Sequence, residues 1–372
     1  MATSERSIVA RRAAVQQVTR SAFREPAELV AWMGAVQAQD PLGARWALGL
    51  RLAGRPGEAA IVRALAEGTI LRTHVMRWTW QLVTPADLRW MLPLVSARLV
   101  ARAARRHREL ALDASTLRRA HAALAGALDG GAHLTRAELA AALRAAGSDP
   151  GGPRLSHLLG HAELHGIVCS GAPRGKQPTW ALLDARAPAA GAPLARQEAL
   201  AELARRYFTS RGPATARDFA WWSGLAPAEA RAGIAGAGAA LAQDVIDGVV
   251  HWQAPQPPAA TRAALDDAYL LPAFDEYLVA YQDRSAMLDP RHARHHNAGG
   301  GMLSPVVVVG GRVVGTWRRT LARKGVTVSL ALFETPAAGD RARIAAAAER
   351  YGAFLGLEAE IEGLTPRTRK DH

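Results

Sequence analysis

The stretch at residues 69–83, TILRTHVMRWTWQLV, marks the change of periodicity that decides the expected fold. Residues 69–73 and 78–83 alternate at a period of two and are rich in β-branched and aromatic side chains, which predicts a pair of strands. Apolar spacing and capping residues before this pair predict helices or helical turns at 6–18, 26–38, 43–52 and 58–66. Three helices followed by such a hairpin form a winged helix.

A similar order of elements recurs twice further along the chain. The second copy has a capping box at 135–138, a helix at 154–165, and strands at 167–170 and 179–183. The turn between those strands is expected to be a cationic wing tip, because it carries Arg174 and Lys176. In the third copy, a cap at 214–218 and Pro227 open helices, and a hairpin turns at residues 247–248.

These patterns predict an α+β fold, mainly α, with three tandem winged-helix units and a small C-terminal β-barrel. The barrel is expected to be partial, with strands at 306–309, 313–317 and 326–333 and a closing helix at 337–355. A connecting helix is expected at 85–107 and a small-residue linker at 185–193. The expected units are 1–105 (first winged helix and connecting helix), 106–192 (second), 193–262 (third) and 263–372 (barrel).

The composition indicates a polyanionic partner. Lys and Arg number 46 against 33 Asp and Glu, so the formal net charge is +13. A GC-rich genome would explain the preference for Arg over Lys, but not the positive excess. Cys169 is the only cysteine, which excludes an intramolecular disulfide and a thiolate metal cluster. No long apolar run and no signal-like N-terminus occur, so we expect a cytoplasmic, nucleoid-associated protein without a membrane span.

Gln37 and Gln39 form an unusual pair, followed by Asp40 and Pro41. On a helix, positions two apart point roughly 200° from each other, so both amides can face one site only if the helix ends there. Pro41 supplies that break and places Gln39 and Asp40 on a turn. From spacing alone the alternative is favoured: the amides cap a helix end or satisfy buried backbone groups.

Further cationic candidates lie at a hairpin tip and in a histidine-rich loop. His74 and Arg77 are expected at the tip of the first strand pair, where a winged helix meets DNA, although an ordinary solvated tip fits as well. Arg291 and Arg294 lie in RHARHHN at 291–297, before three glycines. We expect phosphate contacts or a mobile solvated loop there, and no metal site, because ligand-spaced carboxylates are missing.

Three acidic residues near the C-terminal part, Asp275, Glu276 and Asp283, resemble an acid pair with a neighbour. In a basic protein such groups are usually intramolecular partners of arginine, which is the expectation here. Adjacent Trp221 and Trp222 are expected in the core. The sequence has no dinucleotide-binding glycine fingerprint and no P-loop, so nucleotide-driven motors and dinucleotide oxidoreductases are excluded.

Four segments together resemble the winged-helix DNA glycosylase family of AlkZ-like and YcaQ-like enzymes: VQAQD at 36–40, ARWALGLR at 44–51, LRTHVMR at 71–77 and LPAFDEY at 271–277. The resemblance covers nearly the whole chain and places it in the Gln-x-Gln, AlkZ-like branch. It implies a basic channel for double-stranded DNA and hydrolysis of N-glycosidic bonds of alkylated purines, including interstrand crosslinks such as azinomycin adducts. Trp78 and Gln81 depart from the pattern that relatives often show after the Met-Arg segment.

The resemblance makes Gln37 and Gln39 the catalytic pair, with Asp40 assisting or buried as a cap. Alkylation at N7 charges the purine, so amides suffice to position a water against an oxocarbenium-like sugar. No lysine lies close in sequence, which favours a monofunctional glycosylase over a lyase. We expect a monomer without cofactor, acting in DNA repair and antibiotic self-resistance. The alternative function is a non-catalytic winged-helix regulator or damage sensor.

Overall fold

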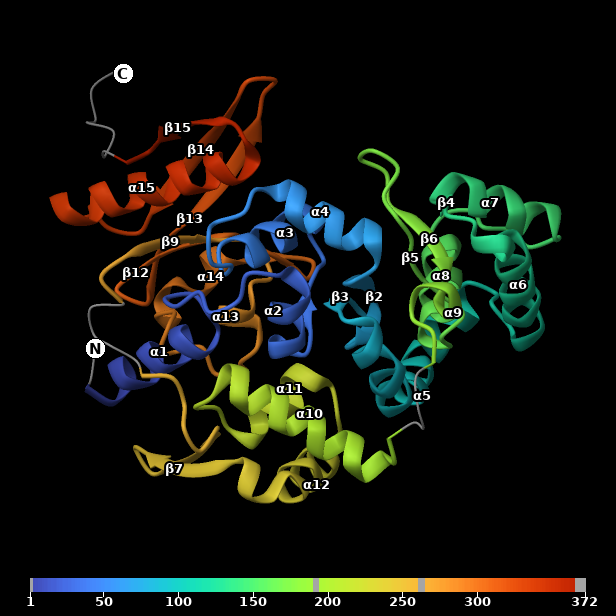
Figure 1. Cartoon of the computed structure of the whole chain (residues 1–372), viewed down its shortest axis with the longest axis horizontal. Coiled ribbons are helices and arrows are strands. Elements are labelled where there is room, and N and C mark those ends of the chain that lie inside the picture. The colour runs from blue at the N-terminus through green and yellow to red at the C-terminus, as the bar shows by residue number, and fades with distance from the viewer. Residues whose placement is uncertain (1–2, 190–193, 260–264, 365–372) are drawn as a thin grey trace.

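The computed structural model describes residues 3–189, 194–259 and 265–364 (Figure 1). The chain is a mixed α+β fold, about half of it helical. Figure 1 shows the segment α6–α9 at one end of the long axis and the C-terminal sheet with α15 at the other. Across all three described ranges, no helix has the length and apolar character that crossing a membrane requires.

The first group of elements follows the expected order up to the hairpin. It comprises α1 (Thr3–Val15), α2 (Pro26–Met33), β1 (Val36–Gln37), α3 (Pro41–Gly49), α4 (Glu58–Glu67), β2 (Leu71–Met76) and β3 (Thr79–Val83). The predicted strand pair is confirmed, and its sheet has the order β1-β3-β2. The predicted helix at 26–38 is wrong beyond Met33, because Gly34 ends α2 with a positive φ of 71°. The chain then becomes extended, and Gln37 lies opposite Gln81 in β3.

The second group begins with the long connecting helix, which is confirmed as α5 (Pro85–Glu109). The capping box between Thr135 and Glu138 is present at the start of α7. The predicted strands at 167–170 and 179–183 form as β5 and β6 and pair antiparallel. The elements after α5 are α6 (Ala114–Ala127), β4 (Leu134–Thr135), α7 (Arg136–Ala145), α8 (Arg154–Leu164), β5 (Val168–Ser170), β6 (Thr179–Leu182) and α9 (Leu183–Arg186).

The third group contains a helix that the sequence analysis did not predict, α10 (Arg196–Arg211). Thr215 caps α11 as expected, and Asp247 and Gly248 turn the hairpin with positive φ values of 50° and 76°. The remaining elements are α11 (Ala216–Ser223), α12 (Pro227–Ala237), β7 (Ala242–Ile246) and β8 (Val249–Gln253). Part of the expected linker, residues 190–193, lies outside the described residues. That these three groups are winged helices stays a prediction.

The C-terminal part is a curled half-barrel and not a closed barrel. Its five strands have the order β15-β14-β13-β12-β9, so β15 and β9 are open edges. Helix α15 packs against this sheet, in agreement with the predicted partial barrel and covering helix. The strands are β9 (Ala268–Leu271), β12 (Val306–Val309), β13 (Arg312–Leu321), β14 (Gly325–Leu332) and β15 (Glu358–Glu362), and α15 is Ala338–Leu355. The sequence analysis did not predict β9 or β15.

Short elements connect β9 to β12 and border the site described below. They are α13 (Glu276–Val279), a 3₁₀ turn (Pro290–His292), α14 (Ala293–His296), β10 (Asn297–Gly299) and β11 (Met302–Leu303). The largest hydrophobic cluster joins side chains from α1, α5, α10 and β12. A second cluster joins α2 and α3 to the C-terminal sheet and α15. The N-terminal elements are therefore held between α10 on one side and the half-barrel on the other.

Candidate active site

A cavity of about 680 Å³ lies where β1, the β2–β3 turn and the segment after α13 meet. Gln37 lies in its wall and is 7% exposed. Three arginines line the same cavity: Arg77, Arg284 and Arg294. A polar amide therefore lies beside cationic side chains that suit a phosphate backbone.

Gln37 is held at both its backbone and its side chain. Its backbone N–H donates to Glu276 Oε1 at 2.9 Å, and its amide Oε1 accepts a hydrogen bond from Arg77 Nη2 at 2.8 Å. Glu276 is itself fixed, because its Oε2 accepts from Arg211 at 2.7 Å and from Trp222 Nε1 at 3.0 Å. The Glu276 and Arg211 side chains are 1% and 0% exposed. The buried ion pair of Glu276 and Arg211 thus fixes the position of β1.

Arg77 lies at the tip of the first hairpin, as expected, but it points into the protein. Arg77 and Trp78 both have positive φ, 54° and 56°, which non-glycine residues rarely adopt. Such strain costs on the order of 1 to 3 kcal/mol per residue and often occurs at functional sites. Burial lowers the pKa of Arg77, and Glu276 opposes that effect. The strained turn therefore brings a desolvated cation to the Gln37 amide.

Gln39 occupies a different environment from Gln37. Gln37 ends strand β1, and Gln39 and Asp40 form a bend, so the predicted helix end is wrong whereas the predicted turn at Gln39 and Asp40 is present. Ala38, between them, is fully buried. Gln39 is exposed, and its Oε1 accepts from the backbone N–H of Trp80 at 3.3 Å. Gln39 thus satisfies a backbone group, and it does not line the 680 Å³ cavity.

Asp40 is an ion-pair partner and not a cap. Its carboxylate accepts two hydrogen bonds from Arg319 of β13, at 2.7 and 3.0 Å. Its side chain makes no capping hydrogen bond to α3, although it holds the N-cap position. The expected cap is therefore wrong. The ion pair links the turn after Gln39 to the C-terminal sheet.

His74 does not lie at the hairpin tip. It lies within β2, is 6% exposed, and its Nδ1 is 2.5 Å from Glu163 Oε2. Its ring packs against Trp80, with ring centroids 4.2 Å apart. The expected tip position is wrong because the strand continues to Met76. The side chain joins β2 to α8 inside the protein.

The other four expected DNA contacts are dispersed. Arg174 and Lys176 are exposed on the turn after β5, where Arg174 forms an ion pair with Glu138 at 2.8 Å. Arg291 is exposed and paired with Asp289 at 2.8 Å. Arg294 lines the cavity of Gln37. The loop expected at 291–297 is instead a 3₁₀ turn followed by α14. Of the six expected contacts, the cavity unites only Arg77 and Arg294 with Gln37.

The acidic candidates divide into two kinds. Asp275 and Glu276 pair with Arg51 and Arg211, so the expected role as arginine partners is confirmed for them. Asp283 instead lines the cavity and accepts a hydrogen bond from the Ser285 backbone N–H at 2.9 Å. That hydrogen bond lowers the pKa of Asp283. A carboxylate in the cavity wall is therefore ionised at neutral pH.

Trp221 and Arg284 line the cavity, so the expectation that Trp221 lies in the core is wrong, and Arg284 was not among the candidates. Trp222 is fully buried as expected, but Trp221 is 43% exposed and lines the cavity. Two adjacent tryptophans on a helix cannot face the same core, and this signal could have identified the exposed ring. Arg284 had no comparable signal.

Comparisons with known proteins agree with this architecture. The profile of the "DNA glycosylase AlkZ-like" family matches residues 30–354. The chain belongs to the AlkZ-like DNA glycosylase family. Among solved structures, it is similar to the Streptomyces sahachiroi DNA glycosylase AlkZ, with a TM-score of 0.76 and 23% sequence identity. The match covers 97% of this chain and 100% of that one. A search of curated proteins finds no match.

At 23% identity, the similarity to the Streptomyces AlkZ shows a shared fold. The family is one of DNA glycosylases. Among the described residues, the group with metal-ligand spacing is His121, His161 and His165, which does not line the Gln37 cavity. The Gln37 cavity itself is lined by amides, arginines and one carboxylate.

Proposed function

We propose that this chain hydrolyses the N-glycosidic bond of N7-alkylated purines in double-stranded DNA. The observation that supports this most strongly is the Gln37 amide, fixed by Arg77 in the wall of a cavity lined by arginines. A pre-oriented polar group in a partly desolvated site acts without reorganising during the reaction. The arginines hold the phosphates on either side of the damaged nucleotide.

The reaction needs little acid catalysis, because N7 alkylation already places a positive charge on the base. The bond between C1′ and the base nitrogen breaks, the base leaves neutral, and the sugar becomes oxocarbenium-like. An amide oxygen accepts two hydrogen bonds, and Arg77 uses one position on Gln37 Oε1. The second position is available to a water whose oxygen then bonds to C1′. Gln39 lies two residues further along the chain and outside the cavity wall, and we assign it as the second member of the pair.

Asp283 supplies the negative charge that two neutral amides lack. Its carboxylate lines the same cavity, and its lowered pKa keeps it ionised. A carboxylate near C1′ stabilises the developing positive charge and takes the proton that the attacking water releases. Asp40 is a weaker candidate for this role, because Arg319 already occupies its carboxylate.

The expected chemistry is monofunctional. A lyase needs an amine that forms a Schiff base, and the sequence has only three lysines, Lys176, Lys324 and Lys370. Neither of the two described lysines lines the cavity. An open cavity also accommodates a base that stays tethered to the opposite strand, so we include interstrand crosslinks among the substrates. Protection against a crosslinking antibiotic follows from that activity.

The test is release of N7-methylguanine from duplex DNA by the purified chain without added metal, followed by chromatography of the free base. The double variant Gln37→Ala with Gln39→Ala is expected to lose about 10²- to 10³-fold in excision rate. Wild-type excision by that variant would show that the amides are not the catalytic pair. Tight, salt-sensitive binding without base release would favour the alternative, a non-catalytic regulator or damage sensor.

A further inference from the structure

Five of the twelve histidines gather outside the wall of the Gln37 cavity, on three helices of the second group. They are His107 on α5, His121 on α6, and His157, His161 and the adjoining His165 on α8. Their rings form a continuous chain of contacts with centroids 4.0 to 5.5 Å apart. The proposed glycosylase chemistry does not use this cluster.

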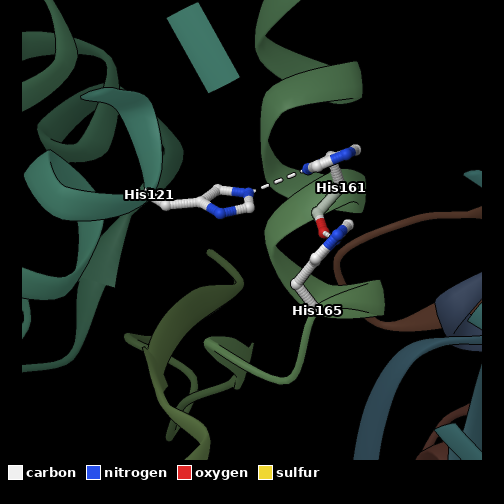
Figure 2. A group of neighbouring side chains, drawn as sticks. All are labelled: His121, His161 and His165. Carbon is white, nitrogen blue, oxygen red and sulfur yellow. Dashed lines mark hydrogen bonds between the residues drawn. The ribbon is translucent and has the colours of Figure 1, made fainter. Parts of the chain in front are cut away.

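Three of these histidines have the spacing of metal ligands. Figure 2 shows His121 reaching from its helix toward His161 and His165, which are one turn apart on the other. One ring nitrogen from each residue lies within 4.8 Å of the others. His161 Nδ1 and His121 Nε2 are 2.9 Å apart. Two nitrogens on a tetrahedral zinc ion lie about 3.4 Å apart, so only small rotations are needed.

The hydrogen bonds of the cluster favour neutral rings, and a metal ion would replace the hydrogen bond between His161 Nδ1 and His121 Nε2. His165 Nδ1 donates to the backbone carbonyl oxygen of His161 at 2.8 Å, which leaves the lone pair on His165 Nε2. Metal-bound histidines commonly have such a second hydrogen bond to a carbonyl oxygen. Burial, and then the neighbouring histidines, lower the pKa of His161 to about 3. Burial also lowers the pKa of His121 to about 4.

We propose that His121, His161 and His165 bind a divalent transition-metal ion, with zinc as the best fit, and that this ion ties α6 to α8. Three neutral imidazoles suit zinc, nickel, cobalt or copper, whereas magnesium and calcium prefer oxygen ligands. His165 is exposed, so an ion can enter from solvent. His107 Nε2 is buried, has no hydrogen-bond partner among the described residues, and belongs to a ring 5.5 Å from that of His161. His107 lies beside the group but is not one of the three residues with metal-ligand spacing.

The proposal is tested on the full, tag-free chain after treatment with EDTA. Zinc chloride is titrated by calorimetry, and the melting temperature is measured with and without zinc. We expect one zinc ion per chain and a rise of several degrees in Tm, because the ion binds the folded state. His165→Gln changes an exposed ligand and is expected to weaken zinc binding at least tenfold without lowering the Tm of the metal-free chain. His161→Gln provides the same test at a buried ligand.

The matched control is the double variant His292→Gln with His295→Gln, since those two rings form a separate pair 6.0 Å apart. It should bind zinc as the wild type does. A wild-type chain that binds no zinc overturns the proposal, as do His165→Gln and His161→Gln chains with unchanged affinity. Loss of zinc binding in this control would assign the ion to His292 and His295 and would also overturn the proposal. Each outcome is independent of base excision.

Discussion

Arg77 donates a 2.8 Å hydrogen bond to the amide oxygen of Gln37 although the two residues are 40 positions apart in the chain. The strained turn between β2 and β3 supplies the cation, and the short strand β1 supplies the amide. The hydrogen bond leaves the Gln37 side chain in one orientation. The reactivity that we assign to the amide therefore depends on a residue that does not have to touch the reacting atoms.

Arg77→Ala is expected to lower base excision by about 10- to 100-fold, because it frees the Gln37 amide to rotate. Arg77→Lys should restore only part of the rate, since lysine lacks the planar fork. In a chain that already carries Gln37→Ala, adding Arg77→Ala should lower the excision rate little further, as expected for two residues that act together. Single-turnover kinetics on N7-methylguanine DNA measure all three, with Arg343→Ala as a distant control. Additive losses would show that Arg77 acts independently of Gln37.

Glu276→Gln is expected to destabilise the fold by about 3 to 5 kcal/mol, because it leaves Arg211 buried without its counter-ion. The same change weakens the bond that holds the Gln37 backbone. Chemical denaturation measures the loss. Asp340→Asn, at an exposed ion pair on α15, is the control and should leave the unfolding midpoint unchanged. Equal stability of the two variants would contradict a structural role for Glu276.

Trp221→Ala is expected to weaken DNA binding by about 1 to 3 kcal/mol, the usual contribution of an aromatic ring that stacks on a base. The ring is 43% exposed at the cavity, and its Nε1 donates to the Val279 carbonyl at 3.2 Å. Trp221→Phe should retain most of the DNA affinity. Trp222→Ala, which removes a buried ring, should instead lower the denaturant concentration at which the chain unfolds. Fluorescence anisotropy with a lesion duplex provides the measurement. If the Trp221→Ala variant bound DNA with unchanged affinity, the Trp221 ring would not contact DNA.

Local signals in the sequence predicted much of the fold, and long-range contacts explain what they missed. The capping box at Thr135 and the turn at Gly248 act over a few residues, and both predictions are confirmed. The helix predicted through Ala38 is wrong because α2 ends at Gly34 and the next residues, Val36 and Gln37, pair with β3 as a strand. Strand β15 (EAEIE) does alternate, but three of its five residues are glutamates, which have low strand propensity, and it forms by pairing with β14.

The candidate site was predictable in composition but not in geometry. The sequence indicated Gln37 and Arg77, yet nothing local indicates that Glu276, 239 positions away, accepts from the Gln37 backbone. His74 was misplaced because burial between β2 and α8 is a tertiary effect. Family resemblance identified the class of enzyme, whereas only the folded chain separates Asp283 in the cavity from Asp275 in the core.

His296 gives the fold a defined acid sensitivity. It lines the Gln37 cavity and is 3% exposed, and its Nδ1 donates to the Ser304 carbonyl at 3.0 Å. Burial, followed by the charge of Arg284, lowers the pKa of His296 to about 4, whereas an unfolded histidine titrates near the ordinary value of 6.5. Above pH 6.5 both states are neutral at this ring, so it contributes no pH dependence there.

Between pH 6.5 and about 4 the unfolded state binds the proton and the folded state does not, so His296 lowers stability as the pH falls. The slope from this one group is at most about 1.4 kcal/mol per pH unit. Denaturant unfolding of the wild type and of His296→Gln at several pH values isolates the contribution. The variant should lose less stability than the wild type on acidification across that window. Parallel curves for the two proteins would mean that His296 protonates equally in both states, and that the cavity wall tolerates a charged ring.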